Sequence, residues 1–199
     1  MSQRLPHFFR IIAALDQGHE QNFVKAAEVF VDGQDSQRVV LHDLLRVCHL
    51  FFGFPRIVRA LTLLSQQLGM PASPSQVEIA ADPLAHGEDL FREVYGRDAD
   101  PVLTHLERVD PQFRAWVLRH AYGTTFATTC LSLAERERLS VMALVATGCW
   151  QQARSHMRAC LRHGVSLEDL LQDLVSVEWL NQEQRDLATT CLHAEAELG

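Results

Sequence analysis

The sequence has little of what would indicate a nucleic-acid-binding, membrane or secreted protein. Its 199 residues carry 18 lysines and arginines against 25 aspartates and glutamates, a formal net charge of −7. Nucleic-acid-binding proteins usually carry a clustered basic surface, which this balance argues against. No apolar run approaches the roughly 20 residues that span a bilayer, and the N-terminal apolar stretch is too short and interrupted for a signal peptide. We therefore expect no nucleic-acid or membrane partner and a cytoplasmic location.

The sequence also lacks the cysteine and histidine patterns of disulfide and metal sites. Its five cysteines are odd in number and widely spaced, so a disulfide framework is not expected. The ten histidines form no cluster with metal-ligand spacing. A phosphate loop, a dinucleotide fingerprint and a nucleophile elbow are absent as well. We expect no metal and no cofactor, and a small molecule as the substrate.

Alternating strand patterns are missing too, whereas almost every segment has apolar residues at helical spacing. The sequence therefore predicts an all-α protein built of helical hairpins. Asp82-Pro83 and Asp110-Pro111 are typical helix starts, and Gly33, Gly69 and Gly164 follow apolar periodic runs as helix ends. The predicted helices cover residues 5–15, 20–32, 37–51, 54–69, 84–95, 99–107, 111–128, 133–147, 149–163, 166–179 and 182–197.

A proline-containing linker, residues 70–83, divides the chain into residues 1–69 and 84–199. Residues 28–47 and 159–177 share one pattern, in which a helix end, a glycine and a polar turn precede a helix carrying Asp-Leu-Leu. We interpret the two parts as related, degenerate helical repeats that pack as one unit.

Polar side chains of complementary chemistry fall on the predicted inward face of the helical hairpin around Gly148. Cys149 and His156 are seven residues apart, which returns a side chain to nearly the same angle on a helix, and Gln152 lies between them. Glu137 falls on the inward face of the preceding helix, where a carboxylate is costly unless it is paired. The spacing predicts one site in which Glu137 and His156 form a proton relay and the helix start favours a thiolate at Cys149.

Structural explanations of the same residues remain open. An inward histidine or cysteine is often core filling, and arginines on both sides of Glu137 allow a register error of one residue. His49, next to the aromatic segment 51–55, is interpreted as core lining, with contact to the pocket beside Gln152 as the alternative.

Residues 131–174 resemble the core of the carboxymuconolactone decarboxylase family, whose relatives include the AhpD-like alkylhydroperoxidases. The similarity lies in an Arg136-Glu137 pair that opens a helix, a small-residue break, and a histidine followed eight residues later by Gly164. The segment FFGFP, residues 51–55, resembles the motif that ends a domain of this kind. The resemblance implies an AhpD-like helical fold, with residues 84–199 as the family core and residues 1–69 as a degenerate repeat.

Alkylhydroperoxidase members have a glutamate, a Cys-x-x-Cys pair and a histidine, and this sequence keeps that pattern in part. Glu137, Cys149 and His156 match the glutamate, the first cysteine and the histidine, whereas Gln152 replaces the second cysteine. A dithiol cycle needs the second thiol to resolve the sulfenic acid, so a lone Cys149 would depend on an external thiol. Decarboxylase-type members work without the pair, by acid–base chemistry on a lactone acid, and Glu137 with His156 is similar to what they retain.

The resemblance implies a carboxymuconolactone decarboxylase-like protein that acts on a small organic substrate through Glu137 and His156. One alternative is an antioxidant, one-cysteine peroxidase that uses Cys149 and an external thiol reductant. Another is a non-catalytic helical oligomer or small-molecule sensor on the same scaffold. Family members are oligomers of intertwined helices, which implies a homo-oligomer here, a dimer, trimer or hexamer.

Overall fold

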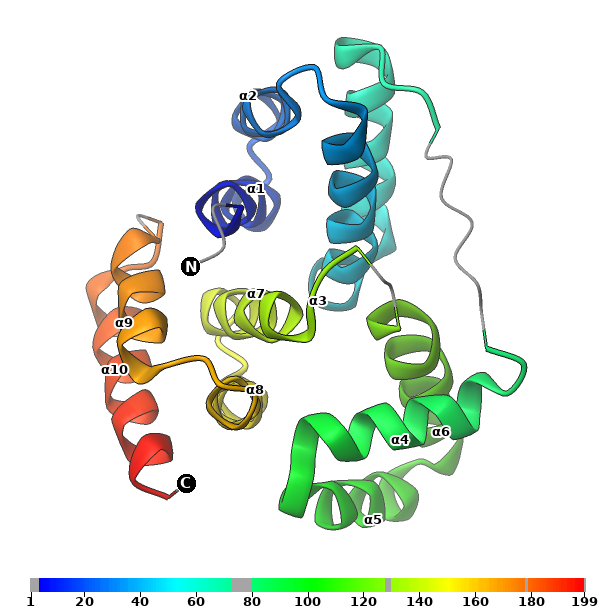
Figure 1. Cartoon of the computed structure of the whole chain (residues 1–199), viewed down its shortest axis with the longest axis vertical. Helices are drawn as coiled ribbons and strands as arrows, with labels where there is room; N and C mark the ends of the chain where they lie inside the picture. The colour runs from blue at the N-terminus through cyan, green and yellow to red at the C-terminus, as the bar shows by residue number, and fades with distance from the viewer. Residues whose placement is uncertain (1–3, 73–79, 128–129, 178, 199) are drawn as a thin grey trace. The chain divides into compact units, whose positions relative to one another are not determined.

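The computed structural model describes residues 4–72, 80–127, 130–177 and 179–198. Every regular element in these residues is helical (Figure 1), which confirms the predicted all-α fold. The elements are α1 Leu5–Gln17, α2 Glu20–Val31, α3 Asp35–Leu68, α4 Pro83–Tyr95, a 3-10 turn η1 Gly96–Asp98, α5 Ala99–Val109, α6 Pro111–Trp116, a π-helix η2 Val117–Phe126, α7 Leu133–Ala146, α8 Trp150–Arg162, α9 Leu167–Ser176 and α10 Gln182–Glu197.

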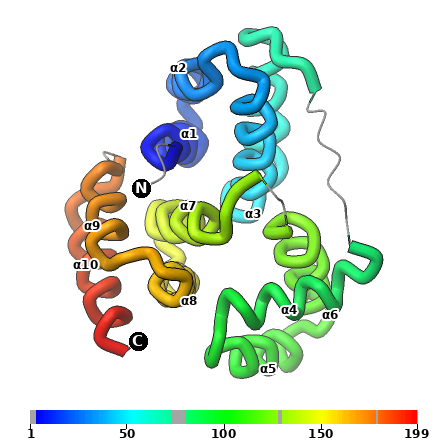
Figure 2. Tube along the Cα trace, in the orientation of Figure 1, coloured from blue at the N-terminus to red at the C-terminus, as the bar shows by residue number. Residues whose placement is uncertain are grey.

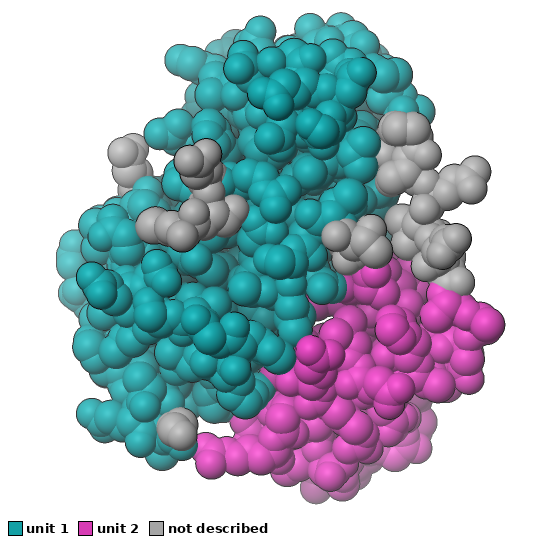
Figure 3. All heavy atoms as spheres, in the orientation of Figure 1, with its two compact units in different colours: residues 1–75, 130–199 teal, residues 76–129 magenta. Residues whose placement is uncertain are grey.

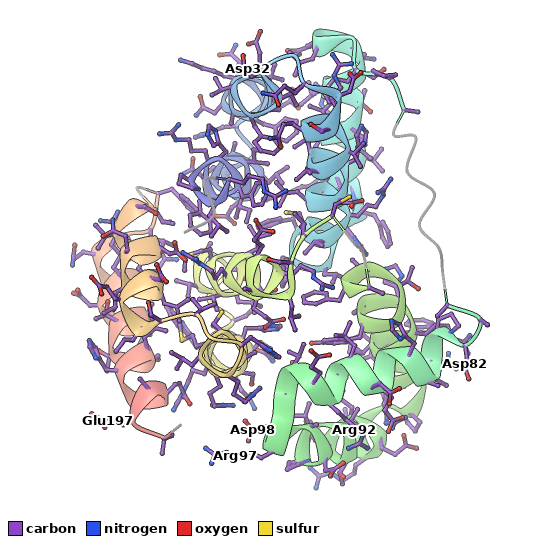
Figure 4. All side chains as sticks on the ribbon, in the orientation of Figure 1. Asp32, Asp82, Arg92, Arg97, Asp98 and Glu197 are labelled. Atoms are coloured by element: carbon purple, nitrogen blue, oxygen red, sulfur yellow. The ribbon has the colours of Figure 1, made fainter. Side chains whose placement is uncertain are left out.

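Local capping explains where several helices begin and end. The Asp82 side chain accepts hydrogen bonds from two backbone N–H groups of the first turn of α4. Ser132 and Glu135 form the reciprocal capping box that starts α7. Asp32, at the end of α2 (Figure 4), has a φ of 40°, the one positive value of a non-glycine residue among those described. The predicted helix 111–128 corresponds to α6 and a π-helix that continues it directly from residue 117.

Helix α3 consists of two arms joined at Gly53. Gly53 has a φ of 78° and a ψ of 161°, a conformation that glycine adopts without steric cost, and Pro55 follows it. Figure 1 shows the chain passing along the first arm, residues 35–52, and returning along the second arm, residues 54–68. The separate helices predicted for this region therefore correspond to the two arms.

Among the described helices, α3 alone has the length and composition to cross a membrane, which the search for apolar runs did not predict. Its mean hydropathy reaches 1.4 over 18 residues, but core helices of soluble proteins also reach this value. In this structure Arg56 of the second arm donates to the backbone carbonyl of Leu15, at 2.6 Å, and to that of Asp16. These bonds fasten the second arm of α3 to the end of α1.

Packing divides the chain into two compact units (Figure 3): unit 1, residues 1–75 and 130–199, and unit 2, residues 76–129. The boundaries differ from those of the proposed repeats, because the units are defined by contacts in space and the repeats by similarity in sequence. The division into repeats stays a prediction. Within unit 1, α7 pairs with α8 and also contacts α1, α3 and α10, so it is the central helix (Figure 2).

Unit 2 depends on close backbone contact between α4 and η2. A Cβ atom placed on Gly87 would lie 1.9 Å from the carbonyl oxygen of Leu118. A Cβ atom on Gly123 would lie 1.8 Å from the carbonyl oxygen of Pro83. Both distances are far below van der Waals contact, so only glycine allows the two helices to pack this closely.

Gly87→Ala should destabilise unit 2 by about 1–3 kcal/mol, because the added methyl group and the Leu118 carbonyl cannot occupy the same space. Hydrogen exchange measured by mass spectrometry on the whole chain should show faster exchange in α4 and η2 and unchanged exchange in α7 and α8. Glu93→Ala, at an exposed position of the same helix, is the control. Equal exchange in the two variants would contradict this packing.

Candidate functional site

Helix α7 carries four consecutive charged residues, Glu135 to Arg138, and all four are buried. A helix that is covered on every side must find partners for such charges within the protein. Arg4 donates to Glu135 at 3.2 Å, and Arg138 makes a two-pronged ion pair with Asp173 of α9, with both distances 2.6 Å. Glu137 finds its partner on α8.

Glu137 and His156 form a buried hydrogen-bonded pair. His156 Nδ1 lies 2.7 Å from Glu137 Oε2, and the two residues are 5% and 0% exposed, respectively. A carboxylate can only accept, so we assign the proton to Nδ1. The turn at Gly148, with a φ of 72°, reverses the chain and lays α8 against α7. The structure thus brings together two residues that the sequence placed in one site.

Cys160 is a neighbour of this pair that the sequence analysis did not place in the site. It lies one helical turn after His156, and this spacing could have indicated that Cys160 is close to the site. Burial raises the pKa of the Cys160 thiol well above its ordinary value, and the charge of Glu137 raises it further. The other carboxylate oxygen, Glu137 Oε1, is buried and has no hydrogen-bond partner among the described residues. The pair is therefore buried beside a thiol that stays protonated at neutral pH.

Cys149 and Gln152 do not share the burial of His156. Both are exposed, so their predicted inward orientation is wrong. Helix α8 begins at Trp150, and Cys149 is its N-cap residue with a φ of −85° and a ψ of 65°. The direction of the Cys149 side chain therefore cannot be derived from helical spacing. Its thiol lies 3.9 Å from the Thr147 carbonyl oxygen. Gln152 belongs to the first turn of α8, beyond the end of α7 at Ala146.

His49 lies at the reversal of α3. Its ring is half-buried, hydrogen-bonds through Nδ1 to the Arg46 carbonyl, and stacks on Phe54 with the ring centroids 4.9 Å apart. These contacts join the two arms of α3, and a role of His49 in the pocket stays a prediction.

Two further thiols differ from Cys149 in their surroundings. Burial raises the pKa of Cys130 to about 11, with a smaller contribution from its hydrogen bond to Asp43. Burial also raises the pKa of Cys48. Within the described part of the chain, no group of three or more histidine, cysteine, aspartate or glutamate side chains could hold a metal ion.

Residues 111–182 match the model of the carboxymuconolactone decarboxylase family. These residues, a little over a third of the chain, are similar to that family. The matched segment includes the hairpin of α7 and α8 with Glu137, Cys149 and His156. No curated protein and no solved structure matches the chain.

Arg138→Ala should lower the free energy of unfolding by about 3–5 kcal/mol, because it leaves the Asp173 carboxylate buried without its cation. The double variant Arg138→Met/Asp173→Leu should recover most of this loss, since it removes both charges. Arg59→Ala, which breaks an exposed pair with Glu20, should cost far less. Urea denaturation followed by circular dichroism compares the three, and equal losses in the two single variants would contradict a buried pair.

Proposed function

We propose that this protein, with its carboxymuconolactone decarboxylase-like segment, is an enzyme that uses His156, oriented by Glu137, as its general acid–base group on a small organic acid. The supporting observation is the buried 2.7 Å contact between His156 Nδ1 and Glu137 Oε2. A glutamate that accepts from Nδ1 fixes the orientation of the ring, so proton exchange with the substrate would run through Nε2.

The family name suggests decarboxylation of a lactone acid, and the pair fits the proton transfer in that reaction. When the substrate carboxylate leaves as carbon dioxide, the electron pair of the broken C–C bond stays on the substrate carbon. Protonated His156 would deliver a proton to that carbon and become neutral. Solvent then returns the proton to the ring, so one proton is consumed for each carbon dioxide released. Glu137 keeps the ring in place throughout.

With carboxymuconolactone as the probe, His156→Ala should lower kcat by about 10²- to 10⁴-fold, the usual contribution of a general acid. Glu137→Gln keeps the shape of the side chain but loses the charge, and it should lower kcat while KM changes little. Cys149→Ser and the exposed-histidine control His193→Ala should retain activity. The assay is carbon dioxide release with purified, folded protein. Activity that survives His156→Ala would contradict the proposal.

The exposure of Cys149 favours a second candidate function, a one-cysteine peroxidase. The thiol is exposed at the N-terminus of α8, where a hydroperoxide can reach it. The thiolate would attack a hydroperoxide, break its O–O bond and become a sulfenic acid, with an alcohol released after protonation. One external thiol would condense with the sulfenic acid, releasing water, and a second would free Cys149 and leave as a disulfide.

Tert-butyl hydroperoxide at pH 7.5 should oxidise one thiol per chain, at Cys149, if this second function holds. Cys130, whose pKa is about 11, stays protonated at this pH and should not react. Mass spectrometry after trapping with dimedone identifies the oxidised residue, and dithiothreitol should restore the thiol. His156→Ala tests whether the thiol depends on the buried pair. Equal labelling of Cys149 and Cys191 would indicate accessibility alone and contradict a peroxidase site.

A further inference from the structure

A cavity of about 280 Å³ lies in unit 1 where α1, α2 and the second arm of α3 meet. Its volume is just below the usual range of small-molecule sites, about 300 to 1,000 Å³, so it suits a compact ligand. Seven of its ten lining residues are apolar, and the three charged ones are Glu20, Arg56 and Arg59. None of the ten belongs to the Glu137–His156 pair.

The apolar and the charged residues occupy different parts of this cavity. Leu15, Phe23 and Leu63 are at most 5% exposed, so they belong to its inner wall. The three charged residues are exposed, so they lie at its mouth. An apolar wall below charged groups fits a ligand that has a hydrocarbon body and a polar group at one end.

Two of the three charges at the mouth compensate each other. Arg59 donates from Nε and Nη2 to the two carboxylate oxygens of Glu20, and both distances are 2.6 Å. A carboxylate and a guanidinium paired in this two-pronged way carry no net charge together. The net charge at the mouth therefore comes from Arg56 and is positive.

Arg56 has N–H donors left after its own bonds to α1. It donates from Nη1 to the backbone carbonyls of Leu15 and Asp16, whereas Nε and Nη2 hydrogen-bond to none of the described residues. Burial raises the pKa of Asp16 and the charge of Arg56 acts in the opposite direction, but the described contacts include no ion pair between the two side chains. Two carbonyls thus hold the guanidinium in place without neutralising it. Its remaining N–H groups match the geometry of a carboxylate.

We propose that this cavity binds a small carboxylic acid in its ionised form, whose carboxylate accepts from Arg56 while its hydrocarbon body packs against Leu15, Phe23 and Leu63. A cationic ligand would be repelled by Arg56, and a neutral ligand would leave the arginine without an anion. The binding needs neither member of the Glu137–His156 pair, so it does not depend on the acid–base function proposed for that pair.

Benzoate, benzamide and benzamidine are matched probes, because they have nearly the same shape and are negative, neutral and positive at pH 7. In the whole chain at low salt, benzoate should cause saturable NMR shifts of the Leu15, Ala60 and Leu63 methyl groups. Benzamide should bind at least tenfold more weakly, which corresponds to about 1.4 kcal/mol, and benzamidine more weakly still. An absence of shifts with benzoate would overturn the site. Equal affinity for benzoate and benzamide would overturn the role of the charge.

The His156→Ala variant distinguishes this cavity from the proposed acid–base site, which also takes an organic acid. The benzoate shifts at Leu15, Ala60 and Leu63 should persist in this variant with the same affinity. Shifts that disappear with His156 would arise from binding at the other site and would overturn the cavity proposal.

Two substitutions by glutamine should change the affinity in opposite directions. Arg56→Gln removes the cation and should reduce the benzoate-to-benzamide ratio to below twofold. Glu20→Gln leaves Arg59 without its anion and adds net positive charge at the mouth, so it should strengthen benzoate binding at least twofold. Lys25→Gln, at an exposed position on α2, is the control and should change neither value. A ratio that Arg56→Gln does not change, or benzoate binding that Glu20→Gln does not strengthen, would overturn the proposal.

Discussion

The requirement that buried charges be paired is the constraint on which unit 1 depends. Four consecutive charged residues of α7 are covered by other helices, and each pair ties α7 to a different part of the chain. Glu135 is held by Arg4 just before α1, Glu137 by His156 of α8, and Arg138 by Asp173 of α9. Removing one partner would leave an uncompensated charge in the core, so these helices cannot shift independently of α7. The pair proposed for acid–base chemistry is one member of this set.

Much of the fold follows from sequence patterns because helices are specified locally. Apolar periodicity and capping residues locate helix ends, as at Asp82 and Ser132. The π-helix after Trp116 could not be predicted in this way, since its extra residue per turn depends on how η2 packs against α4 at Gly87 and Gly123. The Glu135–Arg4 pair joins residues 131 positions apart, and no local pattern predicts such a contact.

The candidate site was predictable only where helical geometry applies. Glu137 and His156 lie inside regular helices, so their inward faces can be derived from spacing, and the structure brings them into contact. Cys149 lies before the first turn of α8, so its spacing of seven residues from His156 does not predict the direction of its side chain. Cys160 shares the helical face of His156, yet nothing in its spacing separates a thiol beside a carboxylate from ordinary core filling.

The reversal at Gly53 also bears on how unit 1 folds. An uninterrupted α-helix of 34 residues would be a rod about 51 Å long, and its two ends could not touch. With the reversal, residues of the two arms that are only about 15 positions apart in the chain line one cavity, as His42 and Ile57 do. Contacts of such short sequence separation have a low entropic cost of closure, so the hairpin of α3 can form early and rapidly. The Arg4–Glu135 pair, in contrast, spans 131 positions, so its closure has a higher entropic cost.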